Sequence, residues 1–192
     1  MSSKGINHLA TADGLFFGKG ALEQRKTEKT VNEALAGCDF AAHTAKVDQS
    51  DEAQVIAAAA DVAATLGRLD ILVVSAGITG PNTTLETYPS DAWQQVIAIN
   101  LNGTFFCDKA VIPHMIERHS GTILMISSMA GIYGFPGEAV YSSTKFAQVG
   151  FAQSLDKELR PHGIKVGLIC PGGVKTEFAI GKGRTEKSVA ES

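Results

Sequence analysis

Residues 121–147 read GTILMISSMAGIYGFPGEAVYSSTKFA, and this stretch decides the fold. It opens with a short apolar run, GTILMISS, which is typical of a strand buried on both faces of a sheet. The loop over 129–140 is rich in Gly and Pro, which favours turns. A helix is predicted over about 141–160, because a helix usually ends before a proline such as Pro161. Strand, loop and helix in this order predict part of a β-α-β unit.

Strands and helices alternate along the rest of the chain as well. In chain order we predict a helix over 22–36, a strand over 40–47, a helix from Ser50 to about Leu66, a strand over 69–77, a helix over 90–118 and a strand over 163–173. Pro113 is expected to kink or interrupt the helix in which it lies. Alternating strands and helices form right-handed β-α-β units and a parallel sheet. The sequence therefore predicts an α/β fold, with residues 1–192 in a single domain.

The composition excludes several functional classes. The 192 residues are 44% hydrophobic and 19% charged, with a net charge of −3 and a pI of about 5.9. This balance gives no electrostatic case for nucleic acid or an anionic membrane as a partner. No apolar run approaches the roughly 18 residues of a membrane span, and the N-terminus has no block of signal-peptide type. The three cysteines and five histidines show no metal-ligand spacing, so we expect a cytoplasmic protein without a metal site.

Small and polar residues stand at the end of three predicted strands. They are Ser75-Ala76-Gly77, Ser127-Ser128 and Pro171-Gly172-Gly173. In parallel α/β sheets, ligands bind beyond the carboxyl ends of the strands. One such strand end could be ordinary turn chemistry, but three of them together predict a shared ligand cleft.

Tyr141 and Lys145 form the pair on which the functional prediction depends. They are four residues apart on a predicted helix and so lie on one face, within reach of each other. A free tyrosine has a pKa of about 10, and a neighbouring ammonium favours the phenolate. Tyr141 could then act as an acid in carbonyl reduction and as a base in alcohol oxidation, while the Ser128 hydroxyl could bond the substrate oxygen. The alternative for the pair alone is a surface Tyr beside a surface Lys.

With these residues, segment 121–147 resembles the active-site segment of the short-chain dehydrogenase/reductase family. Other motifs occur in the family's order: Asp48 after Val47, Ser75-Ala76-Gly77 for its N-A-G signature, Asn100 for the asparagine of its fourth helix, and Pro171-Gly172-Gly173-Val174-Lys175-Thr176 for its P-G-x-V-x-T segment. The resemblance runs from about residue 40 to residue 178. It implies a Rossmann-like, doubly wound parallel sheet flanked by helices, and NAD or NADP as the cofactor.

The resemblance also implies roles for individual residues. Tyr141 would be the catalytic acid/base, Lys145 would lower its pKa and bond the nicotinamide ribose, and Ser128 would orient the substrate carbonyl. Asn100 would hold a water in a proton relay to Lys145; alternatively, it is a helix-interior asparagine that bonds nearby backbone. The cofactor would be lined by Asp48, Ser75, Ala76, Gly77, Tyr141, Lys145, Pro171, Gly172, Val174 and Thr176. Asp48 would bond the adenine amino group, although an aspartate in a turn is the plainer alternative.

The two ends of the chain depart from the family pattern. The family begins with an apolar strand that runs into T-G-x-x-x-G-x-G, whereas here only Ser3-Lys4-Gly5-Ile6 resembles the end of that loop. Residues 9–21 are expected to form the family's first helix, and the chain ends within a segment resembling the substrate lid. We therefore expect a sheet without the usual first and last strands, which either re-pairs around 6–20 or exposes unpaired edges. The residue that separates NAD from NADP cannot be identified.

Two functions of different classes follow. The first is an NAD(P)-dependent oxidoreductase that interconverts a small-molecule secondary alcohol and a ketone. Apolar residues suggest an apolar substrate: Ile132, Phe135, Val140 and Phe178. The second is a non-catalytic or cofactor-impaired family member that acts as a scaffold or oligomer subunit. The resemblance further implies a homodimer or homotetramer, with the helices over about 91–118 and 141–160 pairing across a two-fold axis.

Overall fold

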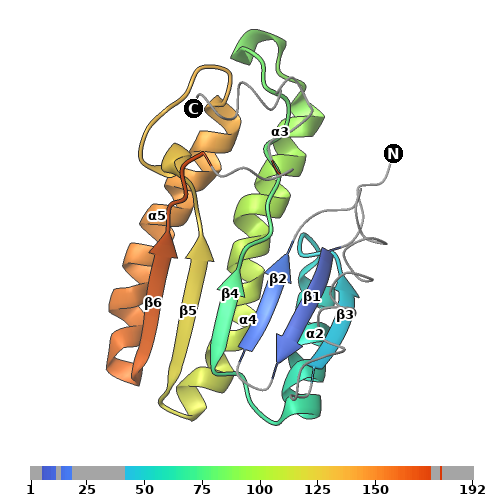
Figure 1. Ribbon diagram of the computed structural model, residues 1–192, viewed down its shortest axis with the longest axis vertical. Helices are drawn as coiled ribbons and strands as arrows, with labels where there is room; N and C mark the ends of the chain where they lie inside the picture. The colour runs from blue at the N-terminus through green and yellow to red at the C-terminus, as the bar shows by residue number, and fades with distance from the viewer. Residues whose placement is uncertain (1–5, 12–13, 19–41, 174–177, 179–192) are drawn as a thin grey trace.

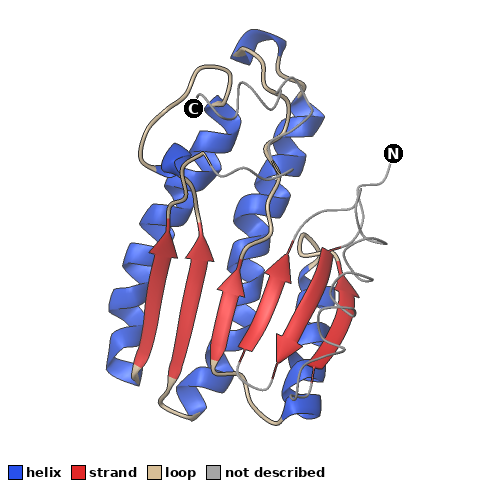
Figure 2. Cartoon of the chain, in the orientation of Figure 1, coloured by secondary structure: helices blue, strands red, loops and turns tan. Residues whose placement is uncertain are grey.

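A six-stranded sheet organises the protein (Figures 1 and 2). The computed structural model describes residues 6–11, 14–18, 42–173 and 178. The strands are β1 (Ile6–Thr11), β2 (Gly14–Gly18), β3 (Ala42–Val47), β4 (Ile71–Val74), β5 (Gly121–Ile126) and β6 (Ile164–Ile169), and their order in the sheet is β3-β1-β2-β4-β5-β6. The predicted strands over 40–47, 69–77, 121–128 and 163–173 are thus confirmed, with shorter bounds.

The amino-terminal part of the sheet differs from the prediction. Residues 9–21 were expected to form a helix, but Ile6–Thr11 and Gly14–Gly18 are antiparallel strands, with Thr11 opposite Gly14. The helix prediction is wrong because it overlooked the local sequence: Asp13-Gly14 is a hairpin dipeptide, and the Leu-Phe-Phe run after it favours a strand. Strand β2 pairs in parallel with β4. The sheet has therefore re-paired around 6–20, with Gly14–Gly18 next to β4.

The sheet is parallel except for one strand. β2, β4, β5 and β6 are parallel neighbours, whereas β1 is antiparallel to both β2 and β3. The predicted parallel sheet is confirmed, and β1 is an antiparallel strand within it. A hairpin connection allows the chain to reverse direction between adjacent strands, whereas a parallel pair needs a longer crossover.

Helices cover one face of the sheet. They are α2 (Glu52–Leu66), α3 (Ser90–Ile97), α4 (Gly103–Glu117) and α5 (Ala139–Leu159), with short 3₁₀ turns at η1 (Leu85–Thr87), η3 (Met129–Gly131) and η4 (Arg160–His162). The crossovers from β3 to β4, β4 to β5 and β5 to β6 all advance in one direction along the sheet. Right-handed crossovers then place α2, α4 and α5 on the same face, as Figure 1 shows. The core between them includes Val55, Leu72, Val111, Ile123 and Leu155.

Helix α2 begins and ends at recognisable signals. The sequence suggested a start at Ser50, but the cap is Asp51, whose carboxylate accepts from the N–H groups of Ala53 and Gln54. Such a cap satisfies N–H groups that have no partner within the helix. The helix ends at Gly67, where φ is 79°, a left-handed conformation that glycine adopts without strain.

The predicted helix over 90–118 is interrupted, though not at Pro113. Pro113 lies inside α4, and the irregularity is a π-helical turn, η2 (Ala98–Asn102), between α3 and α4. The predicted interruption at Pro113 is wrong because a proline removes only one intrahelical bond, and a kink at Pro113 stays a prediction. The π turn depends instead on tertiary contacts that are not local in sequence. Such turns occur frequently at functional sites.

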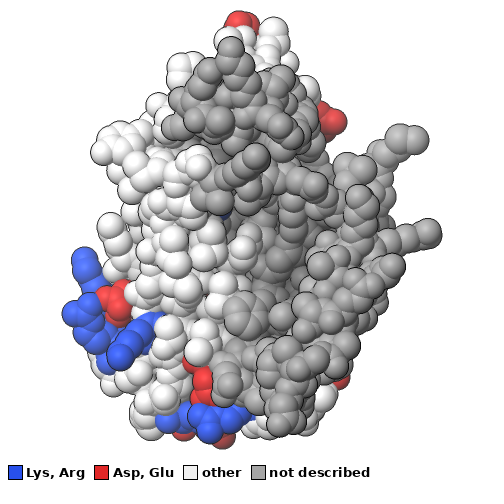
Figure 3. Space-filling model, in the orientation of Figure 1, with Lys and Arg blue, Asp and Glu red and all other residues white. Residues whose placement is uncertain are grey.

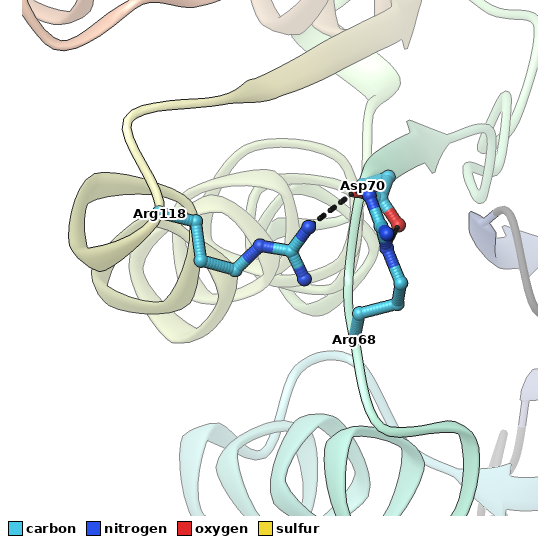
Figure 4. Close-up of polar contacts among 3 residues, drawn as sticks. All are labelled: Arg68, Asp70 and Arg118. Atoms are coloured by element: carbon cyan, nitrogen blue, oxygen red, sulfur yellow. Dashed lines mark hydrogen bonds and ion pairs between the residues drawn. The ribbon is translucent and has the colours of Figure 1, made fainter.

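Charged side chains gather near the amino ends of the strands. Lys and Arg collect low in the view of Figure 3, where β4, β5 and β6 begin in Figure 1. Figure 4 shows Asp70, just before β4, between Arg68 and Arg118. Arg118 Nη2 lies 3.0 Å from Asp70 Oδ1, and Arg68 forms a second ion pair with the same carboxylate. These contacts tie the start of β4 to the end of α4.

Candidate active site

The three strand ends singled out from the sequence lie at one edge of the sheet, because β4, β5 and β6 are parallel neighbours. Two backbone hydrogen bonds extend their pairing past the strands. Ser127 N donates to Ile169 O over 2.8 Å, and Met129 N donates to Pro171 O over 2.9 Å. Ser128 is thereby fixed beside the end of β6.

Lys145 is buried at this edge, with only 3% of its surface exposed. Its ammonium Nζ donates to Ile126 O at the end of β5, over 2.9 Å, and to Gln148 Oε1 over 3.0 Å. Burial lowers the pKa of Lys145 to about 8, and the charge interaction with Cys170 partly opposes this shift. The strand end therefore holds a lysine whose charge can change near neutral pH.

Tyr141 lies one helical turn before Lys145 and is 7% exposed. The ammonium of Lys145 is 5.7 Å from the centre of the Tyr141 ring, and Phe178 packs on that ring at a centroid distance of 6.3 Å. The alternative of a surface Tyr beside a surface Lys is wrong, since both side chains are buried.

Ser128 follows β5 and caps the 3₁₀ turn η3. Its Oγ accepts from Ala130 N over 3.1 Å. The preceding Ser127 donates from Oγ to the Lys145 carbonyl over 3.2 Å, and a Cβ at Gly131 would lie 2.7 Å from that same carbonyl oxygen. The loop after β5 therefore packs directly against the helical turn that carries Lys145, which brings Ser128 to the same region.

Asn100 is fully buried in the π turn and holds the loop after β4. Its side chain accepts from Ile78 N and donates to Ile78 O, both over 2.8 Å, and it donates to Thr144 Oγ1 over 3.1 Å. The backbone it bonds belongs to another segment, so the alternative of bonding within its own helix does not describe this side chain. A Cβ at Gly77 would lie 3.3 Å from Asn100 Oδ1 and 3.8 Å from Lys145 Nζ. Gly77 thus allows the loop to approach both groups closely.

Sequence reasoning missed two buried glutamines. Gln148 Nε2 donates to Asn100 O over 2.8 Å and to Thr104 Oγ1 over 2.9 Å. Gln49 Nε2 donates to Ile99 O over 2.7 Å. A signal was present for Gln148, which stands three residues after Lys145 and so shares its helix face. Gln49 follows Asp48 and gave no comparable pattern.

The expected cofactor-lining residues differ in exposure. Ala76 and Gly77 are buried, Pro171 is half-buried, and Ser75 and Gly172 are exposed. Asp48 follows β3, and its Oδ1 accepts from Ser50 N over 3.0 Å and from Ser50 Oγ over 2.6 Å. These bonds form an Asp turn, which was the plainer alternative for this residue, and they leave Oδ2 as a further acceptor. Val174 and Thr176 lie outside the described residues.

In 6–11, 14–18, 42–173 and 178, His, Cys, Asp and Glu form no group of three or more that could hold a metal ion. Within the same ranges no helix has both the length and the apolar character required for a membrane span.

The fold and this site together define a Rossmann-like α/β class, with a buried Tyr–Lys pair at the carboxyl edge of parallel strands. The model of the short chain dehydrogenase family matches residues 7–187, and the chain belongs to that family.

Relatives and solved structures agree with this assignment. The chain is 45% identical over 131 residues to a 2-dehydro-3-deoxy-L-rhamnonate dehydrogenase (NAD(+)) of Sphingomonas sp. (strain SKA58), covering 68% of the chain and 53% of the relative. The structure of ElxO with NADP bound matches with a TM-score of 0.64 and 36% identity, over 66% of this chain and 51% of that one. The structure of NAD+-bound xylitol dehydrogenase matches with a TM-score of 0.69 and 31% identity, over 75% of this chain and 60% of that one. The chain thus spans about half the length of the first curated relative.

Proposed function

We propose that the protein is an NAD(P)-dependent oxidoreductase that interconverts a small-molecule secondary alcohol and a ketone by hydride transfer. The observation that carries the proposal is the buried Lys145 ammonium, 5.7 Å from the Tyr141 ring centre, at the carboxyl edge of the parallel strands. Family membership supports the same reaction class, and the neighbours with NADP and NAD+ bound support the cofactor.

The residues at the carboxyl ends of β4, β5 and β6 fit NAD or NADP. Gly77 leaves room beside Asn100 and Lys145, and two of the three N–H groups of Lys145 are used by Ile126 and Gln148 among the described residues. One donor therefore remains for a ribose hydroxyl. A bound nicotinamide would supply or accept the hydride. Asp48, Ser75, Ala76, Pro171, Gly172, Val174 and Thr176 are proposed to line the rest of the cofactor.

Tyr141 would carry the proton. In reduction its hydroxyl donates to the carbonyl oxygen, and in oxidation its phenolate accepts the proton of the alcohol. The charged Lys145 ammonium favours that phenolate. Ser128 would hold the substrate oxygen, and Asn100 would hold a water in a proton relay to Lys145. Phe178, packed on Tyr141, and the exposed Ile132 would give the substrate an apolar surface.

Cofactor binding and turnover test the proposal separately. NADH or NADPH fluorescence should change when the purified chain is added at millimolar cofactor, and a panel of secondary alcohols should give turnover that Tyr141→Phe abolishes. An unchanged cofactor spectrum at saturating protein would overturn the proposal.

The second candidate is a non-catalytic or cofactor-impaired member that acts as a scaffold or oligomer subunit. The observation in its favour is β1, which runs against its neighbours in a sheet that is otherwise parallel. Turnover that disappears in Tyr141→Phe would rule this candidate out, whereas a folded chain without cofactor binding would support it.

We further propose that the protein is a cytoplasmic homo-oligomer. A homodimer or homotetramer is supported by large exposed side chains on α4 and α5, where Phe105 is 44% and Phe146 is 47% exposed. Sedimentation equilibrium should give a mass of at least two chains, and a monomer at micromolar concentration would contradict this. A cytoplasmic location fits Cys107 and Cys170, both of which are free thiols.

A further inference from the structure

The π turn η2 (Ala98–Asn102) disturbs the regular pairing of backbone groups between α3 and α4. Two consecutive carbonyls of this turn, Ile99 O and Asn100 O, accept hydrogen bonds from the glutamine side chains of other elements. Both glutamines are at least 99% buried. An unpaired buried carbonyl costs free energy, so these amides stabilise an irregular turn that carries Asn100.

Gln148 does more than satisfy a carbonyl, because its other end holds Lys145. Its Nε2 donates to Asn100 O over 2.8 Å and to Thr104 Oγ1 over 2.9 Å. Its Oε1 accepts from Lys145 Nζ over 3.0 Å. One amide therefore joins the ammonium of α5 to the turn before α4.

The orientation of this amide is fixed by its partners. A carbonyl such as Asn100 O can only accept, and an ammonium can only donate. The amide NH₂ must therefore face Asn100 and the amide oxygen must face Lys145, since the reverse orientation would leave both contacts unmade. Thr104 agrees with this arrangement, because its hydroxyl donates to Asn100 O over 2.8 Å and accepts from Gln148.

We propose that Gln148 is a positioning residue that fixes the Lys145 ammonium relative to Asn100 and so sets the protonation behaviour of the Tyr141–Lys145 pair. The inference rests on the proposed function for its catalytic consequence, but not for its effect on Lys145. Gln148 is neutral, so it holds the ammonium without a counter-charge. Among the described residues, the titratable groups that face Lys145 are Tyr141 on its own helix and Cys170 after β6.

Two substitutions separate the hydrogen bond from the charge. Gln148→Met keeps the length of the side chain but removes the acceptor, so the pKa of Lys145 should fall by about one unit. Gln148→Glu keeps an acceptor for Lys145, loses the donor to Asn100 O and adds a charge, so the pKa of Lys145 should rise by one unit or more. Gln153 stands on the exposed side of α5, and Gln153→Met and Gln153→Glu are the matched controls.

The first measurement is the titration of Lys145 itself, followed by NMR on the full chain with ¹³C-labelled lysine, with the signal assigned by its loss in Lys145→Met. We expect the pKa of Lys145 to be lowest in Gln148→Met, intermediate in the wild type and highest in Gln148→Glu. Both Gln153 variants should have the wild-type value. The same Lys145 pKa in all five proteins would overturn the proposal, whether or not the protein turns over. Far-UV circular dichroism shows which variants are folded, and either folded Gln148 variant suffices for the comparison.

The second measurement is the pH profile of alcohol oxidation. The acid limb of kcat should move to higher pH in Gln148→Glu, because the added carboxylate disfavours the phenolate. In Gln148→Met we expect kcat to fall about tenfold with little change in the KM for the alcohol, as for a displaced catalytic group. An equal fall of kcat at every pH in Gln148→Glu would assign Gln148 a purely structural role and contradict the proposal. Absence of turnover in the wild type would instead contradict the proposed function.

Discussion

The two ends of the sheet hold their charges in opposite ways. At the amino end of β4, Asp70 meets Arg68 and Arg118 in a partly exposed set, with side chains 20%, 55% and 31% exposed. At the carboxyl end, the Lys145 ammonium is buried among a carbonyl and an amide. An exposed ion pair gains little because water screens it. A buried ammonium without a counter-charge is costly, so the fold retains there a charge that destabilises it, which is typical of functional sites.

The largest expected effect of any substitution lies at the carboxyl end. Tyr141→Phe removes the hydroxyl that would transfer the proton, while the ring and its packing against Phe178 remain. Alcohol oxidation should fall by about 10³-fold or more, with the melting temperature nearly unchanged. Steady-state kinetics beside a thermal melt check this, and activity within threefold of wild type would show that Tyr141 does not carry the proton.

Lys145→Met should reduce activity by about 10²-fold with little change in stability, because the loss of its bonds to Ile126 O and Gln148 is offset by the removal of a buried charge. Lys157→Met, an exposed position on the same helix, is the control and should change neither property. Activity and denaturant unfolding of the two variants give the comparison. A large loss of stability in Lys145→Met would assign the lysine a structural role instead.

A second carboxylate, on α4, is the buried counterpart of Asp70. Asp108 on α4 is 1% exposed, and burial raises its pKa well above the usual value. A raised pKa means that the folded state binds more protons than the unfolded chain, so stability is lost as pH rises from about 4 towards the folded-state pKa. Asp108→Asn should remove this loss and raise stability at pH 8 by about 1–3 kcal/mol, with little difference near pH 4.

Urea unfolding of wild type and Asp108→Asn at the two pH values makes the comparison. A difference in stability that is the same at pH 4 and pH 8 would contradict the prediction that Asp108 is the source of the pH dependence.

The smallest effect is expected at the amino end. Hydrogen bonding from Arg68 lowers the pKa of Asp70, and the charge of Arg118 adds to the shift. This contribution is present at neutral pH and is lost as pH falls through the lowered pKa. Asp70→Asn should therefore cost about 0.5 kcal/mol at pH 7 in low salt and less in high salt. A cost that does not depend on salt would indicate a packing role.

The sequence predicted the parts of the molecule whose signals are local. The apolar runs that became β4, β5 and β6 were readable, as was Tyr141 one helical turn before Lys145. The hairpin of β1 and β2 was missed because residues 9–21 were assigned to the family's first helix. The hairpin signal of Asp13-Gly14 and the strand signal of the aromatic residues after it were not used. The π turn was missed because it is supported by contacts with Gln49 and Gln148, which are distant in sequence.

The burial of the site residues and their long-range hydrogen bonds could not be predicted from the sequence. A Tyr and a Lys four residues apart can be exposed or buried, and only the fold shows that both are buried here. Asn100 was expected to hold a water in a proton relay to Lys145, and that role stays a prediction. Its bonds to Ile78 and the bond that its carbonyl accepts from Gln148 could not be read from the chain, because they join residues 22 and 48 positions apart.

The central claim is that the Lys145 charge makes Tyr141 a base at near-neutral pH. The most direct test is the pH titration of tyrosinate absorbance, with Tyr141→Phe subtracted so that only Tyr141 contributes. The account predicts that Tyr141 ionises about two units or more below the ordinary tyrosine pKa of about 10, and that Lys145→Met returns it to that range or above. Ionisation of Tyr141 near pH 10 in both proteins would contradict the account.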